Sequence, residues 1–218
     1  MDTVETTIEP GLTRVDLERW IVDFGRRVID QHEALSDLDA ASGDADHGSN
    51  MERGLSSLLT LVGGWDSAGR PGDFLKDVGL QIVGSVGGSS GALYGTIFLR
   101  MARAVGEAPT VTNELLVAAF EGAAQGVVER GKVSPGDKTM LDALGPAVEA
   151  LRQSVANGAS RSSALLAAAA AADAGRDATA GMVARRGKSS YARERSRGVV
   201  DPGSASVAML VRAAAATL

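Results

Sequence analysis

The segment that decides the fold runs from Thr13 to Ile29 and reads TRVDLERWIVDFGRRVI. Its apolar residues recur three or four positions apart, which is the spacing that places side chains on one face of an α-helix. The segment therefore predicts a first helix that begins near Thr13 and buries its apolar face in a core. The residues of that face are Val15, Leu17, Trp20, Ile21, Phe24, Val28 and Ile29.

The same helical spacing continues along most of the chain, and no convincing alternation of apolar and polar residues indicates a strand. Further helices are predicted over about 48–61, 73–83, a segment after SVGGSSG (85–91), 112–130, a segment capped by Asp137, the alanine-rich run 162–175, and 204–215. These eight helices, joined mostly by short loops, predict an all-α antiparallel bundle. We expect a single domain over residues 1–218, with residues 1–12 as a flexible N-terminal tail.

The composition excludes several classes of protein. The chain has 218 residues, 44% of them hydrophobic but only 4% aromatic, so its core must be built mainly from aliphatic side chains. A net charge of −5 argues against a nucleic-acid partner. Without cysteine there is no thiolate, so any metal must be held by oxygen atoms or by His32 or His47. No apolar run has membrane-spanning length and the N-terminus is unlike a signal peptide, so we expect a soluble cytoplasmic protein with no membrane contact.

The acidic segment DAASGDADHGSNMERG (39–54) is the first candidate site. Asp39, Asp44 and Asp46 lie close together, and converging carboxylates repel one another unless a cation neutralises them. Oxygen ligands of this kind suit Mg²⁺ or Ca²⁺. An EF-hand fits poorly, because Ala41 stands where a ligand is needed and no glutamate occupies the bidentate position. A metal site and a solvated loop in which Asp46 caps the next helix both stay open.

The segment SVGGSSGALYGT (85–96) is the second candidate, because small residues ahead of a helix leave backbone N–H groups accessible to an anion. It is neither a Walker A loop nor a GxGxxG motif. Taken alone, a capping or helix-packing turn is the simpler interpretation. Beside the acidic segment, it favours a phosphate chain that divalent cations bridge to the carboxylates.

Two later segments add weaker signals. In PGDKTMLDALGPA (135–147), Asp137 is the predicted cap, and Met140 in the first helical turn is either a core residue or an apolar surface for a base. The basic run RRGKSSYARERSR (185–197) is a solvated loop, a lid that reaches phosphates, or a docking surface for a partner.

Taken together, these segments resemble the L subunit of dihydroxyacetone kinases, the nucleotide-binding part of that family. The resemblance lies in GDADHGSNM (43–51) with Asp39 upstream, GGSSGALYG (87–95), GDKTMLDAL (136–144) and RRGKSSYARERSRGVVDPGS (185–204). The four segments occur in the family's order and frame nearly the whole chain.

The resemblance implies an antiparallel eight-helix barrel with ADP or ATP bound at one rim, in a site formed by interhelical loops. It implies that Asp39, Asp44 and Asp46 hold two Mg²⁺ ions against the phosphates. The family often has arginine where Lys188 stands, so the charge is kept but the bidentate fork is lost. No residue is assigned as general acid or base, and His32 is read as structural. The implied cofactor-binding residues are His47, Gly48, Ser49, Asn50, Ser89, Ser90, Gly131, Met140, Lys188, Asp201, Pro202 and Gly203.

The resemblance also implies partners. A separate K-type subunit would hold the ketone substrate covalently, and the L subunit would supply the phosphoryl group. In one regime ADP stays bound and a phosphohistidine M-type subunit rephosphorylates it from phosphoenolpyruvate. In the other, ATP is used directly, on dihydroxyacetone or another short ketose such as erythrulose. The remaining functional alternatives are a nucleotide-bound regulatory module and a calcium-binding structural domain, and the missing glutamate disfavours the calcium domain. For the assembly, a homodimer is a further alternative.

Overall fold

The computed structural model describes residues 9–41 and 43–218, and over these residues the chain is all-helical. The prediction of an all-α fold is confirmed. The α-helices are α1 (Arg14–Asp30), α2 (His32–Ala40), α3 (His47–Val62), α4 (Pro71–Ser85), α5 (Gly88–Val105), α6 (Asn113–Gly131), α7 (Leu141–Ala156), α8 (Arg161–Ala178) and α9 (Pro202–Thr217), with 3₁₀ turns η1 (Thr179–Gly181) and η2 (Lys188–Ser196) between the last two.

The eight predicted helices are all present, and the short helix α2 is an addition that the sequence pattern did not separate from α1. The chain bends at Gln31, whose φ of −117° and ψ of 17° lie outside the helical range. The His32 ring Nδ1 lies 2.8 Å from the Ile29 carbonyl oxygen at this bend. Helix α2 therefore leaves the line of α1 and ends beside Asp39, the first residue of the acidic segment.

The sixth predicted helix begins later than expected, and Asp137 is not its cap. Lys138 has a φ of +62°, in the left-handed region, so the helix cannot pass through it. Asp137 instead closes a turn by accepting from the Ser134 N–H at 2.8 Å. Helix α7 starts at Leu141, and Asp142 in its first turn accepts from the Thr139 N–H at 2.7 Å.

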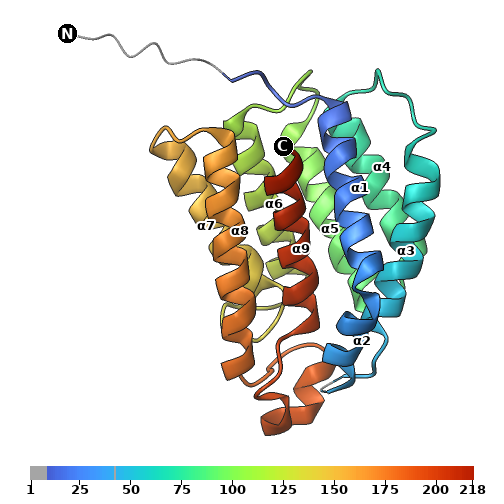
Figure 1. Ribbon diagram of the computed structural model, residues 1–218, viewed down its shortest axis with the longest axis vertical. Coiled ribbons are helices and arrows are strands. Elements are labelled where there is room, and N and C mark those ends of the chain that lie inside the picture. The colour runs from blue at the N-terminus through green and yellow to red at the C-terminus, as the bar shows by residue number, and fades with distance from the viewer. Residues whose placement is uncertain (1–8, 42) are drawn as a thin grey trace.

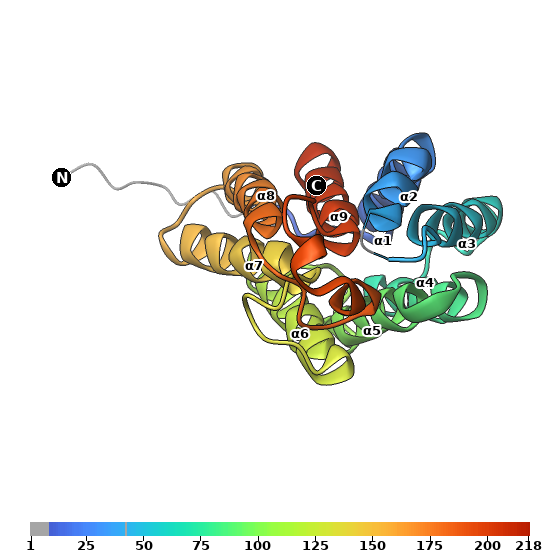
Figure 2. The same cartoon turned by 90° about the horizontal axis from the view of Figure 1, so that it is seen from below.

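The long helices alternate in direction, so that the connections gather at two ends (Figure 1). Neighbours in contact follow the order α1, α3, α4, α5, α6, α7, α8, α9 and back to α1. Helices α1 and α4 are also in contact, as are α7 and α9, and buried side chains from the helices fill the interior of the ring. Seen from below, the segment between α8 and α9 lies across one end of the flattened ring (Figure 2). The description as a barrel stays a prediction.

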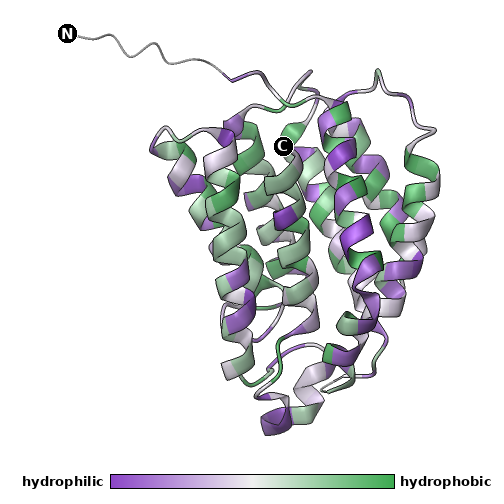
Figure 3. Cartoon of the chain, viewed as in Figure 1, coloured by the Kyte–Doolittle hydropathy of each residue, from purple (hydrophilic) through white to green (hydrophobic). Residues whose placement is uncertain are grey.

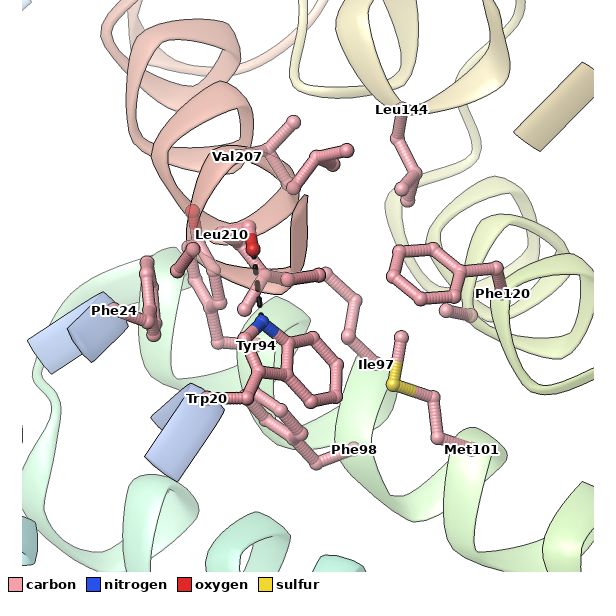
Figure 4. Packing of buried hydrophobic residues seen from close by; sticks show 14 of the residues in the cluster. Trp20, Phe24, Tyr94, Ile97, Phe98, Met101, Phe120, Leu144, Val207 and Leu210 are labelled. Atoms are coloured by element: carbon pink, nitrogen blue, oxygen red, sulfur yellow. Dashed lines mark hydrogen bonds between the residues drawn. The ribbon is translucent and has the colours of Figure 1, made fainter. Parts of the chain in front are cut away.

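Five of the eight aromatic residues meet in the core, namely Trp20, Phe24, Tyr94, Phe98 and Phe120. Trp20 stacks on Phe120 with ring centroids 5.8 Å apart, and Phe24 stacks on Tyr94 at the same separation. The Trp20 indole N–H donates to the Leu210 carbonyl of α9 at 2.9 Å (Figure 4). Aromatic pairs and a satisfied indole fix how α1, α5, α6 and α9 lie against one another.

Most of the predicted apolar face of α1 is buried, but Ile29 is only half-buried and Val15 is exposed. Val15 is 46% exposed, while Arg14 beside it is buried with its guanidinium 4.8 Å above the Phe74 ring centroid. In Figure 3, α1 carries mainly hydrophilic residues on the visible face, whereas α8 and α9 are largely hydrophobic. No helix within residues 9–41 and 43–218 combines the length and apolarity needed to cross a membrane.

Residues 9–12, which we expected to belong to a flexible tail, are held against the bundle. Leu12 and Val111 exchange two backbone hydrogen bonds of 2.8 Å. The Glu9 carboxylate accepts from the Arg161 backbone N–H at 2.9 Å and from the Asn113 amide at 3.1 Å. The rest of the predicted tail, residues 1–8, lies outside the described residues.

Candidate functional site

The three aspartates of the acidic segment converge at the end of the bundle where α2 meets α3. One carboxylate oxygen from each lies within 4.8 Å of the other two. Asp39 is buried at the end of α2 and accepts from the backbone N–H groups of Asp46 at 2.9 Å and His47 at 3.1 Å. Asp46 occupies the N-cap position of α3 but its side chain makes no capping bond. The side-chain cap of α3, which one of the two open interpretations gave to Asp46, is therefore made by Asp39.

Lys188 places a positive charge on this cluster. Its ammonium contacts the Asp44 carboxylate and lies 3.0 Å from Asp46 Oδ2. The hydrogen bond from Lys188 lowers the pKa of Asp44, and Asp44 and Asp46 together raise the pKa of Lys188. Because carboxylates this close repel one another, the cluster favours a cation, and its oxygen ligands are those that Mg²⁺ prefers.

A cavity of about 360 Å³ opens beside the cluster, between the starts of α3, α5 and α9 and the end of α6. Its size falls in the range of small-molecule sites. The segments 138–140 and 186–189 form the remaining walls. The predicted site residues that line it are Asp39, Asp46, His47, Ser89, Ser90, Gly131, Met140, Lys188, Asp201, Pro202 and Gly203.

Four predicted site residues do not line this cavity. Asp44 faces a neighbouring groove that also contains Lys188. Ser49 is exposed and donates to the Asp46 carbonyl at 3.1 Å, while Asn50 is buried and accepts from Arg53 at 2.8 Å. The fourth, Gly48, packs against α2. Gly48 and Ser49 follow His47 directly, and successive helical positions point about 100° apart, so these two residues face away from the cavity.

Gly48 is required by close packing, which gives a stability prediction. A Cβ at this position would collide with the His32 carbonyl oxygen and lie 2.8 Å from the Ser36 nitrogen. We expect Gly48→Ala to lower the free energy of unfolding by about 1–3 kcal/mol, because backbone atoms of α2 cannot move aside cheaply. Urea denaturation followed by circular dichroism measures this. The control is Gly84→Ala in α4, where a Cβ would meet nothing within 4 Å and a small gain in stability is expected. Equal effects of the two substitutions would contradict the packing role.

The cavity has an apolar wall that the sequence analysis identified only in part. Met140 was predicted, but Leu93, Val127 and Val133 join it on the side of α5 and α6. Opposite this wall lie the polar residues of α3, α5 and α9. The arrangement suits a ligand with one flat apolar part and one highly charged part.

Lys138 is the functional candidate that sequence reasoning missed, although it lies inside the motif GDKTM. Its side chain is 1% exposed. Its ammonium lies 2.8, 3.3, 2.7 and 2.5 Å from four carbonyl oxygens of the segment between α8 and α9. Burial lowers the pKa of Lys138, and the nearby Asp201 opposes this. The carbonyls belong to Thr179, Met182, Ser196 and Val199. Lys138 therefore fastens both ends of the loop that carries Lys188.

His47 is a buried residue between helices. Its Nδ1 lies 3.0 Å from Ser90 Oγ and its Nε2 lies 2.9 Å from Ser206 Oγ. Burial lowers the pKa of His47 despite the opposing charges of Asp39 and Asp46, so the imidazole is neutral at pH 7. Both ring nitrogens have partners within the protein, which agrees with reading His47 as a neighbour of the site rather than a proton acceptor.

Asp201 caps α9 at the floor of the cavity. Its Oδ2 accepts from the Ser204 N–H at 2.6 Å, and its own N–H donates to Thr179 Oγ1 at 2.9 Å. Burial raises the pKa of Asp201 to about 7, against the hydrogen bond from Ser204. Pro202 and Gly203 follow as the first turn of α9, so the motif Asp-Pro-Gly starts this helix at the cavity wall.

The fold and the site define a class of protein: an all-helical domain whose rim joins a cluster of three carboxylates to helix starts and an apolar wall. The chain belongs to the DAK2 domain family, whose pattern matches residues 41–216.

Particular relatives cover nearly the whole chain. It is 41% identical, over 93% of its length and 96% of the relative's, to the ADP-binding subunit DhaL of the PEP-dependent dihydroxyacetone kinase of Escherichia coli (strain K12). It is 33% identical to the corresponding subunit of the PTS-dependent dihydroxyacetone kinase of Lactococcus lactis, over 96% of this chain and 95% of the relative's.

Among solved structures, the dihydroxyacetone kinase of C. freundii superposes with a TM-score of 0.71 at 25% identity. The match covers 100% of this chain and 37% of that longer one. A second crystal structure of the C. freundii kinase, in complex with AMP-PNP and Mg²⁺, superposes with a TM-score of 0.69 at 24% identity.

Proposed function

We propose that the chain is the ADP- and Mg²⁺-binding L subunit of a dihydroxyacetone kinase. It transfers a phosphoryl group from bound nucleotide to dihydroxyacetone held on a separate K-type subunit. The observation that carries the proposal is the juxtaposition of the carboxylate cluster, of which Asp39 and Asp46 line the cavity, with the serine-bearing start of α5 in the same cavity. Carboxylates alone repel phosphates, so the pairing makes chemical sense when divalent cations lie between them.

The carboxylates would hold the metal in distinct ways. Asp39 caps α3 through Oδ2, so Oδ1 would be the atom that it offers to a cation. The partly exposed carboxylates of Asp44 and Asp46 would turn to the metal once Lys188 moves away. Three carboxylates match a pair of Mg²⁺ ions better than one, because the ions share the excess negative charge with the phosphates. When bound, the ions neutralise charge that develops on the transferred phosphoryl group.

The remaining residues would position the nucleotide. The apolar wall, with Gly131 and Met140, would flank the base, and the N–H groups at the start of α5, with Ser89 and Ser90, would bind phosphate oxygens. Lys188 would turn from the carboxylates to the phosphates as the loop closes. An ammonium supplies charge without the paired hydrogen bonds of a guanidinium, so its contribution is electrostatic.

Phosphoryl transfer of this kind depends mainly on position and charge. None of the described cavity residues needs to act as a general base, and neutral His47 with two protein partners is unsuited to that role.

We further propose that ADP stays bound and is rephosphorylated in place by a phosphohistidine M-type subunit, with phosphoenolpyruvate as the ultimate donor. Two of the relatives named above belong to PEP- or PTS-dependent kinases. Direct use of ATP, on dihydroxyacetone or another short ketose such as erythrulose, is the second candidate. It is supported by a 34% identical D-erythrulose kinase of Mycolicibacterium smegmatis, a longer chain that this one covers over 33% of its length.

One experiment tests these proposals. The purified protein is denatured in acid and the released nucleotide is quantified by chromatography. We expect about one ADP per chain, because a nucleotide that serves as a bound cofactor survives purification. Absence of nucleotide, together with absence of Mg·ADP binding by calorimetry, would refute the nucleotide site.

The same protein is then assayed with a K-type subunit and dihydroxyacetone, and supplied either with ATP or with phosphoenolpyruvate and its transfer proteins. Product only in the second mixture supports in-place rephosphorylation, whereas product with ATP alone supports the second candidate. A protein that retains ADP yet forms no product in either mixture is a binding module.

A further inference from the structure

A row of buried hydrogen-bonding side chains leads from the core to the cavity. The Tyr94 hydroxyl of α5 donates to Ser206 Oγ of α9 at 2.8 Å. Ser206 Oγ lies 2.9 Å from His47 Nε2, and His47 Nδ1 lies 3.0 Å from Ser90 Oγ. Tyr94 and Ser206 are fully buried, and Ser90 lines the cavity. Figure 4 shows Tyr94 within the aromatic core, so the row connects the core to the cavity wall.

Counting the protons leaves two possible directions for the hydrogen bonds that join Ser206, His47 and Ser90. Burial raises the pKa of Tyr94, so its hydroxyl keeps its proton and donates. Ser206 has one proton and two acceptors within reach, His47 Nε2 and the Gly203 carbonyl at 3.1 Å. Each ring nitrogen of His47 has a serine hydroxyl as its partner, so an imidazole with a single N–H, on either nitrogen, completes both hydrogen bonds. In one direction Ser206 donates to Nε2 and Nδ1–H donates to Ser90, and in the other direction both bonds are reversed.

A bound anion selects between the two directions. Phosphate oxygens only accept, so a useful Ser90 hydroxyl must point its proton into the cavity and accept from His47 Nδ1–H. His47 Nε2 then accepts from Ser206. When Ser206 donates to His47 Nε2, the Gly203 carbonyl gives up its hydrogen bond from the Ser206 hydroxyl. This costs little, because inside α9 the same carbonyl already accepts from the backbone N–H four residues further on. In the reverse direction the Ser90 lone pairs would face the anion.

Resting on the proposed function, we propose that Tyr94, Ser206 and His47 are positioning residues that aim the Ser90 hydroxyl proton at a phosphate oxygen of the nucleotide. His47 acts as the neutral Nδ1–H tautomer. Each donor in the row polarises the next, so the bond that Ser90 makes to the anion is strengthened from within the core.

The tautomer of His47 is the most direct test. The chain contains two histidines, so ¹⁵N-histidine labelling gives two imidazole patterns, and His32→Gln assigns them. With Mg·ADP bound, we expect the His47 proton on Nδ1. In the presence of Mg·ADP, a proton on Nε2 would overturn the inference.

Binding measurements give a second readout. We expect Ser90→Ala to weaken ADP binding about 10-fold, and Tyr94→Phe about threefold to tenfold, as judged by calorimetry. The double variant should bind no more weakly than Ser90→Ala alone, because Tyr94 acts through Ser90. Thr96→Val in the same helix is the control. Its hydroxyl donates to the Ala92 carbonyl of α5 at 2.7 Å and Thr96 does not line the cavity, so the affinity should not change.

The outcomes separate this inference from the proposed function. Failure of the unmodified protein to bind Mg·ADP overturns both. Normal binding with additive effects of Tyr94→Phe and Ser90→Ala, or with the Nε2–H tautomer, overturns the positioning role alone and leaves the kinase subunit in place.

Discussion

Replacing Asp44 by alanine is expected to abolish phosphoryl transfer, with kcat/KM lowered by about 1,000-fold, while the helical circular dichroism persists. Metal ions contribute several kcal/mol of charge stabilisation in such reactions, and Asp44 is one of three carboxylates in the cluster. The side chain is 49% exposed and its partner is the Lys188 ammonium, so its loss leaves the core untouched. Turnover is measured with the K-type subunit and dihydroxyacetone, and Mn²⁺ binding by electron paramagnetic resonance.

The matched control for this prediction is Asp37→Ala, an exposed aspartate on α2 outside the cluster. It removes the same charge from the same end of the molecule and should leave both turnover and Mn²⁺ affinity unchanged. An Asp44→Ala protein that keeps a near-normal rate would show that the metal is held elsewhere.

The second large effect is expected from Lys138→Met, which should release the loop between α8 and α9. Methionine keeps the apolar stem but leaves four carbonyl oxygens without the ammonium that now serves them. We expect the free energy of unfolding to fall by about 2–4 kcal/mol, the range for removing one partner from a buried charged network. Limited trypsin digestion should cut faster within 185–197, where the basic residues provide cleavage sites, and mass spectrometry locates the cuts.

Lys132→Met is a suitable comparison for that variant. Lys132 also adopts a left-handed backbone, with a φ of +51° against +62° for Lys138, but it is exposed at the end of α6. Lys132→Met therefore measures how far methionine in a left-handed conformation lowers the free energy of unfolding, while the contacts of the loop between α8 and α9 stay unchanged. Equal digestion rates for Lys138→Met and the unmodified protein would show that Lys138 does not hold the loop between α8 and α9 in place.

The helices could be predicted from sequence because apolar spacing is a local signal, and the aspartates because their crowding is itself unusual. Other features depend on distant partners. Lys138 lies in a motif that was recognised, yet its burial arises from carbonyls about 40 to 60 positions later, between Thr179 and Val199. Asp39 caps α3 only because α2 turns back toward it, and the bend at Gln31 carries no strong breaker. Spacing alone cannot report either contact.

The positions of the chain ends have a consequence for how this module is used. Residues 9–12 pair with the connection before α6, and α9 ends at Thr217, so both ends of the described chain lie away from the rim that bears the cavity (Figure 1). Extra polypeptide fused at either end emerges on the far side and leaves the cavity mouth open to an incoming partner. The same fold can therefore occur as a separate subunit or as one region of a longer chain. In the C. freundii kinase, the matching region makes up 37% of the polypeptide.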